Sequence, residues 1–232
     1  MTSSSSSSSN SSSNSSSNAT TRLAVRCGFI APVIVIGTIV LATILASPET
    51  FTWRSRALSD LGRPAARTFW LFNVGLVVGG LIGIPFVRAL WRTSRNTAER
   101  VGAVLTGVSL LGMIGVGIFF LEHTHYYLET DFHGVAALTV FGVAPFAQLL
   151  VGTGQILEGD RWLAIASVWL GMTHAVGWVA WLLTRAVADD PWHWFAVPEF
   201  VAALAFAVWI VLLTRYGFDR SRDSDRRATL DR

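Results

Sequence analysis

The stretch TFWLFNVGLVVGGLIGIPFV, residues 68–87, decides the fold class of this chain. It holds no charged side chain, and about 20 apolar residues in a helix cross the hydrocarbon core of a bilayer. Five more apolar runs occur along the chain, and none alternates as a β-barrel strand does. The sequence therefore predicts an all-α, polytopic membrane protein with six transmembrane helices in a bundle. The predicted spans are 27–46, 68–87, 101–121, about 133–157, 162–184 and about 195–214.

The predicted domain of six helices covers residues 23–215, between two polar tails. Residues 1–22 are rich in serine and asparagine and have almost nothing apolar to bury, so they are predicted to be disordered. Asn10, Asn14 and Asn18 form sequons, which are most simply chance products of a Ser/Asn tract. The apolar run 27–46 is too long for a signal peptide, and Ile44 stands where a cleavage site needs a small residue. Residues 216–232 form a charged tail.

The composition of the chain excludes several classes of function. Cys27 is the only cysteine, so an intrachain disulfide, a thiolate zinc site and a CxxC redox site are excluded. The basic residues are eighteen arginines and no lysine. A retinal Schiff base and a P-loop both need a lysine. No basic stripe is interleaved with aromatic residues, so the expected partner is the lipid bilayer and not a nucleic acid.

The arginines also predict the orientation of the helices. With the N-terminus inside, thirteen arginines lie in inner segments and five in outer segments, four of them in the first loop. Because basic residues favour the cytoplasmic side, both termini are predicted to be cytoplasmic. Gly75, Gly79 and Gly83 recur every fourth residue, which predicts one packing face on the second helix.

Histidines and acids gather in LEHTHYYLETDFH, residues 121–133, on the predicted outer side. If the fourth helix started early, His125, Glu129 and His133 would stack at i, i+4 and i+8 and could hold a divalent metal such as zinc. Asp60 or Glu199 would then be a fourth ligand or a general base. The favoured alternative is a solvated acidic loop with tyrosines at the membrane interface.

Four more polar residues are candidates for a site. Glu199 follows Pro198 in the first turn of the sixth helix, where the helix dipole stabilises a carboxylate, yet an acid at membrane depth is often functional. Asp60 could share Arg63, Arg67 or a proton with it. His174, in the middle of the fifth span, is either a buried neutral histidine or part of a proton path or substrate contact. Asn73 is most simply a residue that hydrogen-bonds between helices. Its functional alternative is the same proton path or substrate contact as for His174.

Two stretches carry a resemblance to a known family. LSDLGRPAARTFWLFNVGLVVGGLIGIPF and GIFFLEHTHYYLETDFHGVAALTVF resemble the prokaryotic membrane family called domain of unknown function 998. The matching residues are Ser59, Asp60, Leu61, Gly62, Phe72, Asn73 and His133, and the resemblance covers roughly residues 25–215. It implies a multi-pass protein of a prokaryotic cell membrane. The pattern is also distantly similar to the superfamily of the autophagy modulator DRAM and a GPI-lipid-remodelling protein, which implies a lipid-related role.

Three hypotheses about function follow from these residues. The first is recognition or hydrolysis of a lipid or a small polar substrate at an outer mouth built by Asp60, His133 and Glu199. No Gly-x-Ser-x-Gly elbow occurs, so a carboxylate or metal-bound water would be the base. The second is a proton-coupled transporter or channel that uses Asp60, His174 and Glu199. The third is a structural or regulatory membrane subunit, and the sequence specifies neither a substrate nor an oligomeric state.

The predicted orientation can be tested by chemical labelling. A cysteine introduced into residues 216–232 should be protected from a membrane-impermeant maleimide in intact cells and should react after the cells are lysed. Labelling in intact cells would place the tail outside and reverse the orientation.

Overall fold

A computed structural model describes residues 8–187 and 192–217 of the chain, with side chains from residue 22 onward. Its long helices are α1 (Ser8–Leu45), α2 (Phe69–Thr93), α3 (Thr97–Ile118), α4 (His133–Leu157), α5 (Arg161–Val187) and α6 (Ala196–Leu212). Short helical segments are η1 (Leu58–Gly62), η2 (His123–His125) and η3 (Leu213–Gly217). The described residues contain no strand, so the predicted all-α class is confirmed.

The six predicted spans are also confirmed. Each long helix is long and apolar enough to cross a membrane, in α1 over Arg22–Leu45 and in α6 together with η3 over Ala196–Gly217. The observed α4 has the predicted bounds. One difference lies at the start of α1, which begins at Ser8, inside the segment predicted to be disordered. There the backbone continues the helix of the apolar span.

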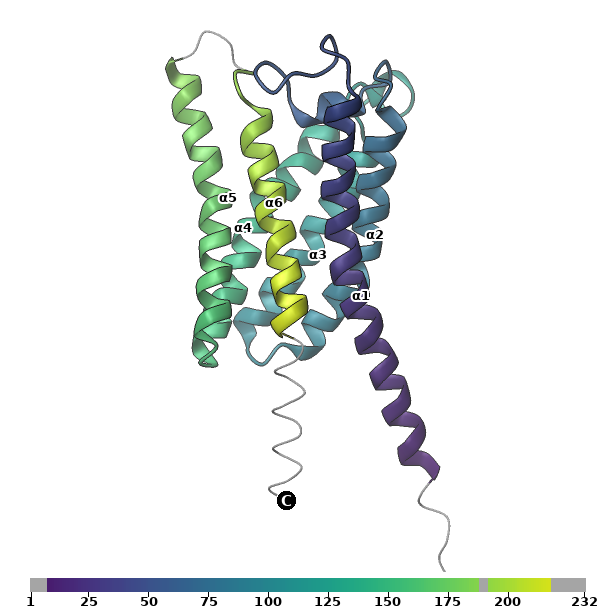
Figure 1. The fold of residues 1–232 in the computed structure, drawn as a ribbon, viewed down its shortest axis with the longest axis vertical. Helices are drawn as coiled ribbons and strands as arrows, with labels where there is room; N and C mark the ends of the chain where they lie inside the picture. Colours follow the sequence, from purple (N-terminus) through teal and green to yellow (C-terminus); the bar gives the residue numbers. More distant parts are fainter. Residues whose placement is uncertain (1–7, 188–191, 218–232) are drawn as a thin grey trace, which may run out of the picture.

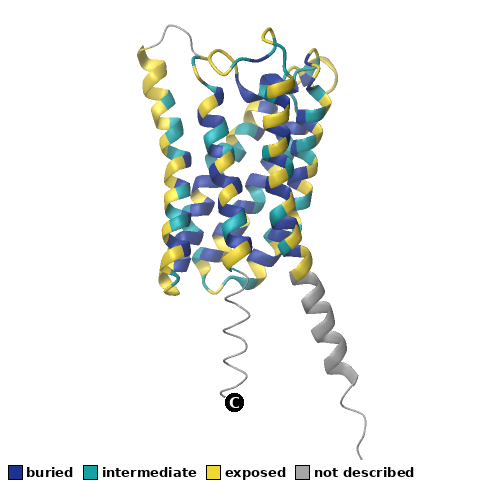
Figure 2. Cartoon of the chain, in the orientation of Figure 1, coloured by how far each residue is buried: buried dark blue, intermediate teal, exposed yellow. Residues whose placement is uncertain are grey.

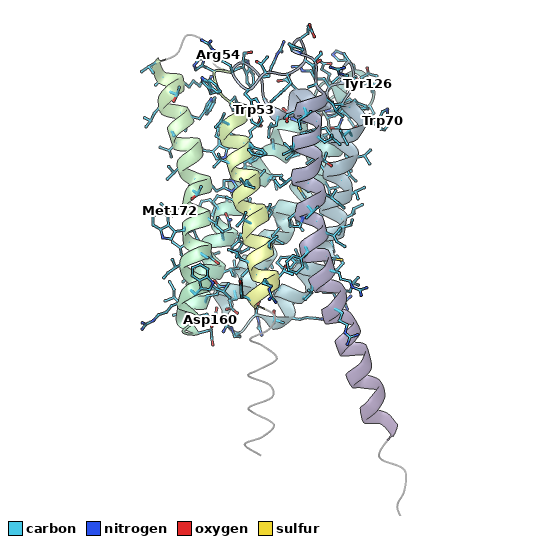
Figure 3. All side chains as sticks on the ribbon, in the orientation of Figure 1. Trp53, Arg54, Trp70, Tyr126, Asp160 and Met172 are labelled. Carbon is cyan, nitrogen blue, oxygen red and sulfur yellow. The ribbon has the colours of Figure 1, made fainter. Side chains whose placement is uncertain are left out.

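The helices form a single ring in chain order. Each helix packs on the next from α1 to α6, and α6 returns to contact both α1 and α4 (Figure 1). The described ends of the chain lie at the same end of the bundle. At the opposite end, which we call the loop end, lie η1, η2 and the connection before α6. Trp53, Arg54 and Tyr126 are at the loop end, whereas Asp160 is at the other end (Figure 3).

Local chemistry explains where several helices begin. The Asn96 side chain caps α3 by accepting the Glu99 N–H at 3.0 Å. The Asp131 carboxylate accepts the His133 N–H at 3.0 Å, which satisfies a donor at the start of α4. Pro198 lies in the first turn of α6, where the N–H that proline lacks is not needed.

Burial follows the pattern of a protein in lipid. Large apolar side chains such as Trp169 and Met172 project outward, and the buried faces turn toward the middle of the bundle (Figures 2 and 3). In α5 every buried residue lies between Leu163 and His174, so the half that follows His174 contributes no buried residue. Figure 2 shows this half of α5 as largely exposed. In its loop-end half, α5 therefore buries no residue against the rest of the bundle.

Glycines let α2 approach two neighbours. A Cβ on Gly75 would meet the Thr38 side chain of α1 at 2.3 Å, and one on Gly79 would meet Val35 at 2.3 Å. A Cβ on Gly83 would instead meet Leu110 of α3 at 2.6 Å. The predicted packing role of these glycines is confirmed, but they do not all face one neighbour, because residues four apart drift around a helix with 3.6 residues per turn. The three glycines serve two helix contacts.

The close contact between α3 and α2 gives a test of this packing. A Cβ on Gly117 would lie 2.5 Å from the backbone oxygen of Asn73, which a side-chain rotation cannot relieve. Gly117→Ala should destabilise the protein by about 1–3 kcal/mol, visible as a lower melting temperature in detergent. Gly37→Ala is the matched control, because nothing lies within 4 Å of its Cβ, and it should keep or raise the melting temperature. Equal melting temperatures for the two variants would contradict the packing.

Candidate functional site

A segment at the loop end, residues 57–62, covers the middle of the bundle and is called the cap loop here. Its backbone is held by side chains from several elements. Asp60 accepts the Ala57 N–H at 2.9 Å, and Glu199 of α6 accepts the Leu58 N–H at 2.6 Å. The Thr68 hydroxyl donates to the Leu61 carbonyl at 2.7 Å, and the Asn73 amide donates to the Gly62 carbonyl at 2.9 Å. These four side chains are buried.

Arg63 links the cap loop to the connection between α3 and α4. Its Nε donates to Asp60 Oδ1 at 2.5 Å, and its Nη1 pairs with Glu122. Partial burial works to lower the pKa of Arg63, but the hydrogen bonds and charges of Asp60 and Glu122 outweigh it and raise the pKa above its ordinary value. Arg63 is therefore a charged clamp. A second loop contact, from the Trp194 N–H to the Arg54 carbonyl at 2.8 Å, ties in the connection before α6.

Two histidines of the connection between α3 and α4 have different surroundings. The fully buried ring of His123 lies between the carbonyls of Phe120, at 2.9 Å, and Thr130, at 3.2 Å, and so holds the loop together. The His133 Nδ1 lies 2.7 Å from the Phe119 carbonyl, which requires Nδ1 to carry the proton. In the neutral ring Nε2 is then an acceptor, and it bonds to nothing in the described part of the chain.

Beneath the cap loop lies a cavity that runs along the bundle. It has about 90 Å³ of room for the centres of water-sized spheres, so the space open to the atoms of a ligand is larger. All six long helices and η1 contribute to its wall, which is mostly apolar. Ser59, His133 and Glu199 line its loop end, and His174 lines it deeper in the bundle. The cavity therefore has a polar end, an apolar length and one polar side chain inside.

The structure places the sequence candidates in three groups. Asp60, His133 and Glu199 come together at the loop end, and Asp60 interacts electrostatically with the other two. Asp60 turns to the cap-loop backbone and Arg63, so it does not line the cavity. Arg63 pairs with Asp60 and Glu122 but not with Glu199, whose partner is a backbone N–H. His174 lies apart from these residues, inside the bundle.

Asn73 has a different role from the predicted interhelical bond. Its amide donates to Gly62 in the cap loop and to Phe69 in its own helix, and the residue lies outside the wall of the central cavity. The interhelical prediction is therefore wrong. The reason is local, because Gly62 ends η1 directly above the first turns of α2 and leaves its carbonyl oxygen to be satisfied.

The helical face that would stack His125, Glu129 and His133 does not form. Since α4 begins at His133, His125 lies in η2 and Glu129 in the exposed segment between them. Within residues 22–187 and 192–217, no group of three or more His, Cys, Asp or Glu side chains could hold a metal ion. A zinc site stays a sequence prediction, which elemental analysis of the purified protein tests.

The sequence analysis did not predict two polar features of the structure. Ser59 lines the cavity, although the sequence marks it only as part of the SDLG motif. At the opposite end of the bundle, Arg95 pairs with buried Glu99 at 2.6 Å and with Asp160 at 2.8 Å. The four-residue spacing of Arg95 and Glu99 was the available signal. These bonds raise the pKa of Arg95 despite its partial burial, and they fasten α3 to the α4–α5 turn.

Comparison with known proteins gives one match. A sequence model of the family described as Protein of unknown function (DUF998) matches residues 29–216, which contain every residue that lines the cavity. This match does not show the distant similarity to the DRAM superfamily. No curated protein and no solved structure matches the chain significantly.

The cap loop generates a stability prediction. Asp60→Asn removes the charge that receives Arg63 and should destabilise the protein by about 1–3 kcal/mol, which a melting curve in detergent measures. Glu129→Gln is the control, because Glu129 is exposed and makes no hydrogen bond or ion pair in the described structure, and it should leave the curve unchanged. If Asp60→Asn melts like Glu129→Gln, the clamp contributes nothing to stability.

Proposed function

We propose that this chain, which belongs to the DUF998 family, binds an amphipathic lipid-like molecule in its central cavity, with the polar end of the ligand under the cap loop. The observation that carries the proposal is the distribution of polar side chains along the cavity. Three of them meet at the loop end, and apolar side chains line nearly all of the remainder. Small-molecule sites commonly combine an apolar wall with a few convergent polar groups.

The apolar length of the cavity favours a hydrocarbon chain over water. Val35, Leu76 and Phe206 are among the side chains of its wall, and an apolar cavity offers water too few hydrogen bonds. The six spans expose large apolar side chains, as expected of a protein in a lipid bilayer, and hydrocarbon chains are abundant there. Burial of apolar ligand surface would contribute about 25 cal/mol per Å² before the costs of association.

The polar end of the cavity restricts the head group. His133 Nε2 is an acceptor, and the Ser59 hydroxyl can both donate and accept. The Glu199 carboxyl group has one oxygen on Leu58 and a second that makes no hydrogen bond in the described structure. Asp60 lies close by, so an anionic head group would meet two carboxyl groups. A neutral head group with several hydroxyls, such as the glycerol of a monoacylglycerol, fits these groups best.

The rival functions receive less support from the same residues. A proton path from Glu199 to His174 would need polar groups between them, whereas the cavity wall there is apolar. A purely structural subunit would not need a cavity with polar groups at one end. Hydrolysis of a bound ester is the catalytic form of the proposal, because Ser59 and His133 line the same end. The binding experiment with 1-oleoylglycerol described below also tests for hydrolysis, because oleate would be released.

A variant that fills the cavity tests the proposal. Ala203 lines the cavity, and Leu204, the next residue of α6, faces outward. Ala203→Phe should weaken binding of 1-oleoylglycerol at least about tenfold in nanodiscs, because the added ring occupies the ligand space. Leu204→Phe adds a ring to the lipid-facing side and should bind like the natural protein.

A second variant examines the polar end. Ser59→Ala removes a hydroxyl that bonds to nothing in the described structure, so it should keep the melting temperature and weaken binding by roughly two- to tenfold. Oleate release by the natural protein would establish hydrolysis in addition to binding. The proposal is wrong if 1-oleoylglycerol does not bind, or if the Ala203 and Leu204 variants bind it equally.

A further inference from the structure

We infer that the ligand of this cavity carries a second polar group, a hydroxyl partway along its apolar chain, and that His174 recognises it. The inference rests on the proposed function, because it specifies the chemistry of the molecule in the same cavity. It assigns a ligand-binding role to His174, which does not hold the cap loop in place.

His174 is a buried polar side chain without a partner. The residue is 1% exposed, and neither ring nitrogen makes a hydrogen bond with normal geometry to any described residue. The Phe141 backbone faces the imidazole as an acceptor but falls short of normal hydrogen-bond geometry, and the Phe141 ring meets the imidazole edge-on with centroids 6.3 Å apart. Burying an unsatisfied polar group costs about 1–3 kcal/mol in proteins. A buried, unpaired imidazole on a cavity wall therefore indicates a ligand group that completes its hydrogen bonds.

The depth of His174 sets the position of that group. His133 begins α4 at the polar end, and Phe141 lies eight residues further along the same helix, against His174. Eight residues at 1.5 Å per residue place the imidazole roughly 12 Å below the polar end. Both Phe141 and Ala144 line the cavity beside His174, so the deep polar point lies inside an apolar section.

The two ring nitrogens of His174 restrict the chemical class of the ligand group that can bind there. A neutral imidazole offers one donor and one acceptor. A hydroxyl can donate to the bare nitrogen or accept from the N–H. Where the N–H faces the Phe141 backbone carbonyl, the other nitrogen is an acceptor, to which a hydroxyl can donate and a carbonyl oxygen cannot. A plain alkyl chain satisfies neither nitrogen. The ligand that fits is a monoacylglycerol-like molecule whose chain carries a hydroxyl near its middle.

A matched pair of probes tests this inference. 1-Ricinoleoylglycerol and 1-oleoylglycerol differ only by a hydroxyl partway along the acyl chain, beyond its double bond. The natural protein in nanodiscs should bind the hydroxylated probe about five- to tenfold more tightly, which corresponds to one net hydrogen bond. His174→Leu should lose this preference. Thr173→Leu, at the exposed neighbouring position, should retain it.

The outcomes separate this inference from the proposed function. If the natural protein binds both probes equally, the His174 inference is wrong while the lipid site stands. A preference that persists in His174→Leu would also overturn the inference. If neither probe binds to protein that melts normally, the proposed function fails and the inference fails with it. His174→Leu should melt no lower than the natural protein, since it removes an unsatisfied polar group.

Discussion

The need to satisfy the buried backbone of the cap loop constrains the rest of this structure. A short segment between long helices that is packed into a membrane bundle has little access to water for its N–H and C=O groups, and each unsatisfied group is costly. Here Asp60, Thr68, Asn73 and Glu199 each supply one partner. The donors and acceptors come from the loop itself, from the start of α2 and from α6. The loop conformation and the positions of these helix ends are therefore fixed together.

This constraint divides the polar residues of the bundle into two kinds. Asp60 and the Asn73 amide nitrogen bond to the loop and its arginine, as Glu99 bonds to Arg95 at the other end. Ser59, His133 and His174 keep unused hydrogen-bonding capacity and line the cavity. Burial alone does not separate these groups, because most members of both are buried. The hydrogen-bond partners separate them, and they direct the functional hypothesis to the second group.

The sequence predicted the helices well and the site only in part. Long apolar runs locate the membrane spans, so α4 was predicted with its observed bounds, whereas α2 continues to Thr93, six residues beyond its predicted end. The convergence of Asp60, His133 and Glu199 followed from loops that share one end of the bundle. Asn73 was assigned to the wrong partner, because the fold of the cap loop depends on contacts distant in sequence, such as Leu58 with Glu199. The cavity and the unpaired nitrogens of His174 arise from six helices packing at once, which periodicity does not encode.

Glu199 belongs to both kinds of residue, because one oxygen holds the Leu58 N–H while the side chain lines the cavity. Such a shared group couples two equilibria, and coupling free energies are reciprocal. A molecule that binds better when the loop is closed must make the closed loop more favourable by the same factor. The cap loop and the proposed ligand would then each be an effector of the other, joined through a single carboxyl group.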